Sequence, residues 1–191
     1  YVAGGDTAIV GLQYAYTPSW ATSIFDEGLP DATAAALFDA VEARWSQLPA
    51  DDRPRLIVHG LSLGAQGTQN AFGSLEAILQ RTDGALFVGL PGTVALWREL
   101  QASRDAGSPA WQPVLDDGRT VRWGSLPGDL DRPPGPWSAP RVVYLQHATD
   151  PVTWLAPELF WSAPEWLRAD QRGADVSPRM VWIPVVTGLQ V

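Results

Sequence analysis

The sequence has no cysteine and no lysine, and only two histidines among its 191 residues. The lack of cysteine excludes disulfides, thiolate catalysis and cysteine-ligated metal sites, and two histidines argue against a zinc site. We therefore expect neither a metal nor a cofactor. All 13 basic residues are arginine, they face 21 acidic residues, and the net charge is −8. This acidic balance without a basic run gives no support for a nucleic-acid partner.

Long apolar runs are also lacking. No stretch reaches the roughly 20 apolar residues of a membrane-spanning helix, and no signal peptide is visible, so we expect residues 1–191 themselves to be soluble. Hydrophobic residues make up 46% and charged residues 18% of the chain, which is typical of a globular protein. The length suits one domain with a substantial core, so we expect a single domain over residues 1–191.

The most informative stretch is Gly60-Leu61-Ser62-Leu63-Gly64, which follows a short apolar run at residues 56–58 and precedes a helical pattern. This order of strand, sharp turn with serine and helix is that of a nucleophile elbow, in which small residues flank a strained turn. Ser62 is the candidate nucleophile, and the backbone amide of Leu63 is the candidate oxyanion donor. The alternative is a glycine-rich turn without chemistry.

Apolar strands and amphipathic helices alternate along the rest of the chain, which predicts an α/β fold with a mostly parallel sheet and helices on both faces. The loop at residues 17–30 carries Trp20, Ile24 and Phe25, which either pack beneath it or line a ligand cleft. Residues 107–140 read as an excursion, with a hairpin around Asp116-Asp117-Gly118 and a proline-rich connection. The expected strands are residues 8–16, 56–58, 84–90, 141–146 and 180–187, and the expected helices are residues 32–48 (with Asp31 as N-cap), 71–79 with a break at Gly73-Ser74, 94–104, and an irregular helix at 154–167.

A serine nucleophile needs a base and an orienting acid. Asp150 follows the strand at residues 141–146, at the sheet end where parallel sheets bind ligands, and is the candidate acid. The pair Asp150-Pro151 is also typical of a helix N-cap followed by proline at the first helical position, and one residue could serve both purposes.

The base is harder to assign. His59 lies only three residues before Ser62, which is poor geometry, so we interpret it as a structural histidine with a satisfied ring. His147 lies near Asp150 and is a candidate base, although it could equally pack against or hydrogen-bond a neighbouring loop. A histidine beyond residue 191 is the third alternative, and the one we favour. Only one strand is expected before the elbow, so the usual loop that gives a second oxyanion donor is not found.

Several stretches together resemble the α/β-hydrolase superfamily, and more closely the bacterial family in which a C-terminal α/β-hydrolase domain follows a multi-pass membrane domain. They are GGDTAIV at residues 4–10, PSW at 18–20, SLG at 62–64, RTDGAL at 81–86, LWREL at 96–100, RVVYLQH at 141–147 and PVVT at 184–187.

The resemblance implies Ser62 as nucleophile and Asp150 as acid, and membrane association of the parent protein. It also implies that residues 1–191 correspond to about the fourth to eighth strands of the fold, with a gap or altered pairing beside the strand at residue 8. The family's longer domain would supply the second oxyanion donor upstream and a histidine downstream.

Two functions of different kinds follow. The first is a serine hydrolase or acyl-transfer domain acting on an ester or thioester, with a small-molecule or lipid acyl substrate. The second is a non-catalytic binding or interaction domain with the same fold. A third reading, phosphate binding at the helix that follows Ser62, is opposed by the acidic balance and the lack of lysine. The oligomeric state cannot be predicted from these patterns.

Overall fold

The computed structural model describes residues 6–14, 28–154 and 156–187 and contains a four-stranded parallel sheet. Every pairing in the sheet is parallel, as the continuous apolar strands predicted. The strands lie in the order β1-β2-β4-β3, and their bounds are β1 Ile57–Leu61, β2 Gly84–Val88, β3 Val121–Gly124 and β4 Arg141–Leu145.

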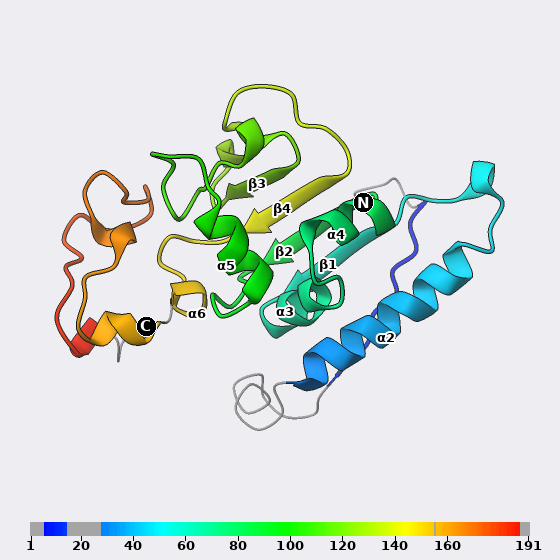
Figure 1. Ribbon diagram of the computed structural model, residues 1–191, viewed down its shortest axis with the longest axis horizontal. Helices are drawn as coiled ribbons and strands as arrows, with labels where there is room; N and C mark the ends of the chain where they lie inside the picture. Colours follow the sequence, from blue (N-terminus) through cyan, green and yellow to red (C-terminus); the bar gives the residue numbers. More distant parts are fainter. Residues whose placement is uncertain (1–5, 15–27, 155, 188–191) are drawn as a thin grey trace.

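Figure 1 shows the helices packed around this sheet and the C-terminal segment, orange to red, beyond the carboxyl ends of the strands. The helix after the elbow is broken near Gly73-Ser74, as expected, and the Ser74 hydroxyl accepts from the Ala77 amide to begin the second half. The helices are α2 Gly28–Trp45, α3 Leu63–Asn70, α4 Leu75–Arg81, α5 Ala95–Ala102 and α6 Pro151–Trp154, and the 3-10 turns are Ala50–Asp52, Asp116–Gly118, Asp129–Asp131, Pro157–Phe160 and Glu165–Leu167.

The main core lies between the helices and one face of the sheet. Phe87, Tyr144 and Trp123 come from three adjacent strands, are at most 1% exposed and stack in sequence at ring-centroid distances of 5.2 and 4.9 Å. The other face is less covered within the described residues, and Ile57 and Leu61 of β1 are 55% and 62% exposed. The parallel sheet with helices packed on it confirms the predicted α/β fold class.

Helix α2 is fastened to α4 by Arg81. Its guanidinium binds the carboxylates of Glu42 and Asp39 on α2 and lies over the ring of Phe38 at 4.7 Å. Hydrogen bonding to Glu42, followed by Asp39, raises the pKa of Arg81. Asp31 was expected to cap this helix, but α2 begins at Gly28, so Asp31 lies in its first turn.

Three expected elements are wrong in the described residues. Residues 8–14 form no strand, although they were predicted to be one. Residues 180–187 form no strand either, because Pro184 has no amide to donate and Val185 has a φ of 67°. The expected hairpin is absent, because residues 112–115 are not a strand and β3 pairs in parallel with β4.

The three apolar loop residues Trp20, Ile24 and Phe25, for which packing or a ligand cleft was expected, lie outside the described residues. The short helices between Pro151 and Leu167 confirm the expected irregular helix in that region.

Candidate active site

Ser62 occupies the sharp turn between β1 and α3. Its torsions are φ 53° and ψ −123°, a region that residues with a side chain rarely adopt. Three backbone hydrogen bonds hold the turn: the Ser62 amide donates to the Val88 carbonyl at 2.8 Å, and the Ser62 carbonyl accepts from the amides of Ala65 and Gln66 at 2.9 and 3.1 Å. The predicted order of strand, turn and helix is therefore present, with the serine at its most strained point.

Gly60 makes this turn sterically possible. A Cβ atom at Gly60 would collide with backbone atoms of Gly64 and Ala65, so the strand and the helix approach each other more closely than a side chain would allow. The motif's second glycine has no such constraint, since a Cβ at Gly64 would meet nothing within 4 Å. The two glycines of the motif thus have different structural importance.

The amino end of α3 offers free backbone donors beside Ser62. No side chain caps this helix, and the amides of Leu63 and Gly64 make no hydrogen bond to a described residue. The Ser62 hydroxyl is partly exposed and likewise bonds no described residue. The Ser62 hydroxyl thus lies beside two backbone amides at the positive end of a helix, and such amides can donate hydrogen bonds to an oxyanion.

Asp150 lies where the sequence placed it, beyond the end of β4, and it also caps a helix. Its Oδ1 accepts from the amides of Val152 and Thr153 at 2.9 and 3.4 Å, so the N-cap interpretation is confirmed. Its Oδ2 faces Gly89, where a Cβ would lie only 3.3 Å from that oxygen. One oxygen of this carboxylate is thus used by the helix, and the other faces the end of β2.

The sheet brings Asp150 close to Ser62. Ser62 directly follows β1 and Gly89 directly follows β2, and adjacent strands are about 4.8 Å apart. The Asp150 carboxylate, which lies over Gly89, is therefore about one strand removed from the serine.

Neither described histidine forms a hydrogen bond to Ser62 or Asp150. His147 is exposed, and its Nδ1 lies 3.1 Å from the Asp175 Oδ2, so this ring pairs with the C-terminal segment rather than with Asp150. Its expected alternative role, a hydrogen bond to a neighbouring loop, is what the structure contains. His59 lies in β1, as predicted, but its ring is exposed and has no partner among the described residues. The partner that was expected to satisfy the His59 ring is therefore not found among the described residues.

Two residues near the site were missed by the sequence analysis. Gly89 has a φ of 55°, and because it has no side chain the Asp150 carboxylate can lie close to the end of β2. In the sequence, only its position directly after a buried strand could have drawn attention to it. Asp175 lies in an irregular segment, 28 residues from its partner His147, where no periodicity could have identified it.

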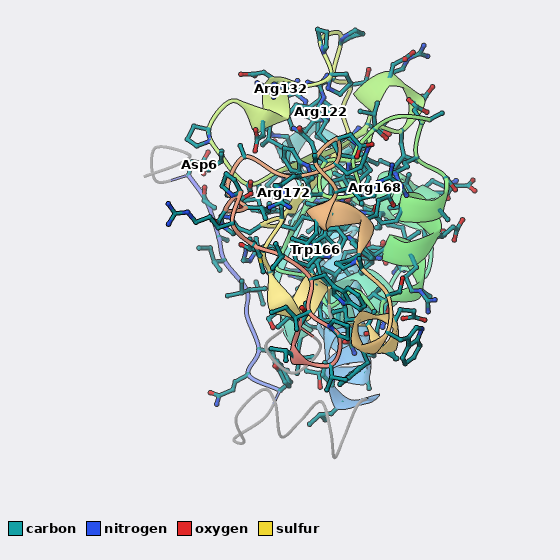
Figure 2. The ribbon with its side chains drawn as sticks, turned by 90° about the vertical axis from the view of Figure 1, so that its left-hand side faces the viewer. Asp6, Arg122, Arg132, Trp166, Arg168 and Arg172 are labelled. Carbon is teal, nitrogen blue, oxygen red and sulfur yellow. The ribbon has the colours of Figure 1, made fainter. Side chains whose placement is uncertain are left out.

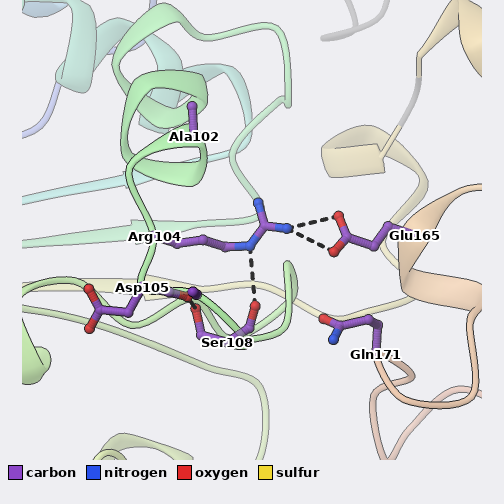
Figure 3. A pocket seen from close by; sticks show the side chains of 8 residues that line it. Ala102, Arg104, Asp105, Ser108, Glu165 and Gln171 are labelled. Carbon is purple, nitrogen blue, oxygen red and sulfur yellow. Dashed lines mark hydrogen bonds and ion pairs between the residues drawn. The ribbon is translucent and has the colours of Figure 1, made fainter.

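A hollow of about 290 Å³ lies between α5 and the C-terminal segment (Figure 3). Arg104 crosses it and donates through Nη2 to both carboxylate oxygens of Glu165 at 2.8 Å. The Arg104 Nε also donates to the Ser108 carbonyl at 3.2 Å. The ion pair between Arg104 and Glu165 thus occupies the polar groups that line this hollow, and it links α5 to the C-terminal segment.

No group of three or more histidine, cysteine, aspartate or glutamate side chains is arranged to hold a metal ion within residues 6–14, 28–154 and 156–187. In the same ranges no helix combines the length and the apolar character that are needed to cross a membrane.

Comparison with known proteins gave one informative result. A family model described as "Alpha/beta-hydrolase family" matches residues 1–191, which is the whole chain. No curated protein and no solved structure matched.

Proposed function

Because the chain belongs to the alpha/beta-hydrolase family, we propose that it is a serine hydrolase or acyl-transfer domain that acts on an ester or thioester. The observation that carries this proposal is the backbone of Ser62, which has a side chain at φ 53° and ψ −123° between β1 and α3. Such strain costs on the order of 1–3 kcal/mol and is concentrated at functional sites. Lipid esters and small-molecule esters are both candidate substrates.

In the proposed reaction the Ser62 Oγ attacks the carbonyl carbon while a base removes its proton. The amides at the start of α3, that of Leu63 first, stabilise the oxyanion that forms. The intermediate collapses to an acyl-serine as the alcohol or thiol leaves with the proton from the base. Attack by water, or by an acceptor in an acyl transfer, then releases the acyl group and regenerates the serine.

The base in this proposal is a histidine standing between Ser62 and Asp150. Asp150 orients it through Oδ2, while Oδ1 continues to cap α6. Within these residues the candidate is His147, which would have to exchange its contact with Asp175 for one with Asp150. A histidine supplied from outside the 191 residues is the alternative, and it is the one that the family resemblance favours.

Labelling with a fluorophosphonate probe tests the nucleophile, and added imidazole tests the position of the base. We expect slow labelling of the 191-residue protein that imidazole accelerates, because a free imidazole can occupy the space between Ser62 and Asp150. Ser62→Ala should abolish labelling under both conditions. Ser103→Ala, at an exposed serine, is the matched control and should label like the unmodified protein.

The histidines are separated by the same assay. If His147 is the base, His147→Gln should slow labelling by about 10²–10⁴-fold, and imidazole should restore it. An unchanged rate in His147→Gln would assign the base to another segment. Unchanged labelling in Ser62→Ala, or no labelling of folded protein even with imidazole, would contradict the hydrolase proposal.

A non-catalytic binding domain is the second candidate, and one observation favours it. His147 is engaged by Asp175, so within the described residues no imidazole contacts Ser62 or Asp150. In that case a substrate analogue would bind to the protein, and Ser62→Ala would leave its affinity unchanged.

We also propose, from the family resemblance alone, that this domain belongs to a membrane-associated protein. Fractionation of cells that express the natural gene would test it: the hydrolase domain should sediment with membranes and resist extraction by high salt. Recovery in the soluble fraction would contradict the proposal.

A further inference from the structure

Asp150 lies one strand closer to Ser62 than the order of the sheet alone would place it. It follows β4, and β4 is separated from β1 by β2, which amounts to two strand spacings, or about 9–10 Å. The Asp150 Oδ2 nevertheless faces Gly89, which directly follows β2. A specific contact must therefore hold this carboxylate over the neighbouring strand.

The side chain of Thr153 provides that contact. Thr153 lies in α6 and is 2% exposed, and its Oγ1 donates to the Leu90 carbonyl at 2.9 Å, across 63 residues of sequence. Its amide also donates to the Asp150 Oδ1, at 3.4 Å. One residue therefore binds the carboxylate through its amide and the loop after β2 through its hydroxyl.

A glycine allows the loop after β2 to lie directly against α6. A Cβ atom at Gly92 would collide with the Thr153 carbonyl, and the Gly92 amide donates to the Val152 carbonyl at 3.3 Å. The loop and the helix thus meet through their backbones, with no side chain between them. We refer to this approach, together with the hydrogen bond from Thr153 to Leu90, as the Thr153 contact.

We propose that Thr153 is a positioning residue for the acid of the active site. It holds the Asp150 carboxylate at the end of β2, one strand from the nucleophile, where the carboxylate orients the base. Thr153 is not itself catalytic, because its hydroxyl binds Leu90 and its effect on the reaction passes through Asp150. This inference rests on the proposed function and extends it to a residue that no motif indicates.

The helix cap alone does not determine where the carboxylate lies. The bonds that Asp150 Oδ1 accepts from two amides are internal to the start of α6, so carboxylate and helix can move together. At the other end of this four-residue helix, the Trp154 ring packs against Trp97 at 5.7 Å. The Thr153 contact joins the end that carries Asp150 to the loop after β2.

Thr153→Val tests the hydroxyl, because valine keeps the shape of the side chain and removes the donor. A misplacement of about 1 Å in an active site can slow a reaction by about 10²-fold. We therefore expect imidazole-stimulated labelling by the fluorophosphonate probe to slow by about tenfold or more. The probe concentration for half-maximal rate should not change, and Thr153→Ser, which keeps the hydroxyl, should restore the rate.

Thr82 offers a matched control at the opposite end of β2. It is 6% exposed and its Oγ1 donates to the Ile78 carbonyl at 2.8 Å, so Thr82→Val removes the same kind of buried hydrogen bond. Thr82 precedes β2 by two residues, whereas Gly89 follows it. Thr82→Val should destabilise the protein to a similar extent and should label at the rate of the unmodified protein.

A double-mutant cycle tests whether Thr153 acts through Asp150. Asp150→Asn keeps an oxygen that can cap α6 but removes the charge that orients the imidazole, so labelling should slow. Adding Thr153→Val to Asp150→Asn should then cause little further slowing, because residues that act as a unit are not additive. Equal slowing by Thr153→Val in both backgrounds would overturn the proposal.

Amide hydrogen exchange at Gly92 measures the Thr153 contact without any use of the serine chemistry. The Gly92 amide bonds the first turn of α6, so it reports whether the loop and the helix stay together. We expect Thr153→Val to speed exchange at Gly92 by about tenfold or more and Thr82→Val to leave it unchanged. Unchanged exchange in Thr153→Val would show that the hydroxyl does not hold the helix, and would overturn the proposal.

The labelling results separate failure of this inference from failure of the proposed function. Labelling that depends on Ser62 and is equally fast in Thr153→Val would overturn the positioning role and leave the hydrolase intact. Similar slowing in Thr153→Val and Thr82→Val would indicate general destabilisation and would also overturn it. Absence of Ser62-dependent labelling in the unmodified protein would contradict the proposed function itself, and the positioning role with it.

Discussion

Ser62 combines a strained backbone conformation with neighbouring amides that are available as hydrogen-bond donors. Its φ is positive although it carries a side chain, and the two amides that follow it make no hydrogen bond within the described part of the chain. Asp116, Asp117 and Val185 also have positive φ, but none lies between a buried strand and a helix of the core. Position, rather than strain alone, therefore distinguishes Ser62.

Replacing Ser62 by glycine should relieve this strain. Glycine adopts φ 53° and ψ −123° without a steric penalty, whereas alanine retains the Cβ atom. Because a glycine also makes the unfolded chain more flexible, we expect Ser62→Gly to be more stable than Ser62→Ala by only about 1 kcal/mol. Urea denaturation at a constant m-value measures the difference. Equal midpoints would show that the turn is not strained in solution.

Tyr144 should make the protein sensitive to alkaline pH. The ring is 1% exposed, its hydroxyl donates to the Gln69 Oε1 at 3.0 Å, and burial raises its pKa above the ordinary value. Below pH of about 10 the phenol is protonated in both the folded and the unfolded states, so it has no effect on the pH dependence. Above that pH only the unfolded state releases the proton, and stability should fall by about 1.4 kcal/mol per pH unit from this group.

The comparison of Tyr144→Phe with the unmodified protein isolates this contribution. The variant should be less stable at pH 7, because the buried Gln69 amide loses its partner at a cost of about 1–3 kcal/mol. The gap between the two proteins should then narrow as the pH rises above about 10. Tyr14→Phe controls for the loss of one phenol. A gap that stays constant up to pH 11 would contradict the assignment.

At the scale of elements, the backbones of β1 and α3 lie closer together at Gly60 than a residue with a side chain would permit. The two glycines of the motif give a matched pair, because a Cβ at Gly60 meets backbone while a Cβ at Gly64 meets open space. We expect Gly60→Ala to cost about 3 kcal/mol or more, since backbone must move. Gly64→Ala, inside the helix, should be neutral or stabilising by up to about 1 kcal/mol. Thermal unfolding of the pair tests this, and similar losses in both would contradict the packing.

Elements whose identity depends on local pattern were predictable from the sequence. β2 and β4 are continuous apolar runs, and the break between α3 and α4 follows from Gly73 and Ser74. Elements that depend on a neighbour were not predictable. Residues 8–14 have the composition of a strand but pair with no described strand, and the position of β3 beside β4 is set by sheet order, which no local pattern encodes.

The candidate site divides in the same way. The turn at Ser62 and the placement of Asp150 follow from motif and strand order, which act over short distances along the chain. The partner of His147 does not, because Asp175 reaches it from an irregular segment. Motif and strand order therefore predict which residues follow the strands at this end of the sheet, but they do not determine how side chains from distant segments pair.

Across the whole molecule, the parallel sheet and the C-terminal segment have separate apolar clusters. The sheet cluster contains Phe87 and Tyr144, whereas Trp166, Leu167 and Val176 form a smaller cluster with Ala148. The smaller cluster is covered by irregular backbone, and Figure 2 shows Trp166, Arg168 and Arg172 together on this face. Regions with few regular hydrogen bonds open at lower free energy than a sheet core.

Arg172 should control that opening. It donates to the carbonyls of Ser177 at 2.6 Å, Met180 at 3.1 Å and Leu167 at 2.6 Å, so one side chain ties together three points of the C-terminal segment. Arg172→Met should therefore speed cleavage of this segment by chymotrypsin by about tenfold or more, because charge-assisted hydrogen bonds contribute about 1.5–3 kcal/mol each.

Arg168→Met is the matched control for this change. Arg168 is exposed, and among the described residues its side chain pairs with Asp170 alone, at 3.3 Å. Such a surface pair contributes about 0–1 kcal/mol, so cleavage should change little. Hydrogen exchange at Phe87 and Tyr144 should stay slow in both variants, because their cluster does not depend on Arg172. Faster exchange at these two core residues in Arg172→Met would instead mean that sheet and C-terminal segment unfold as one cooperative unit.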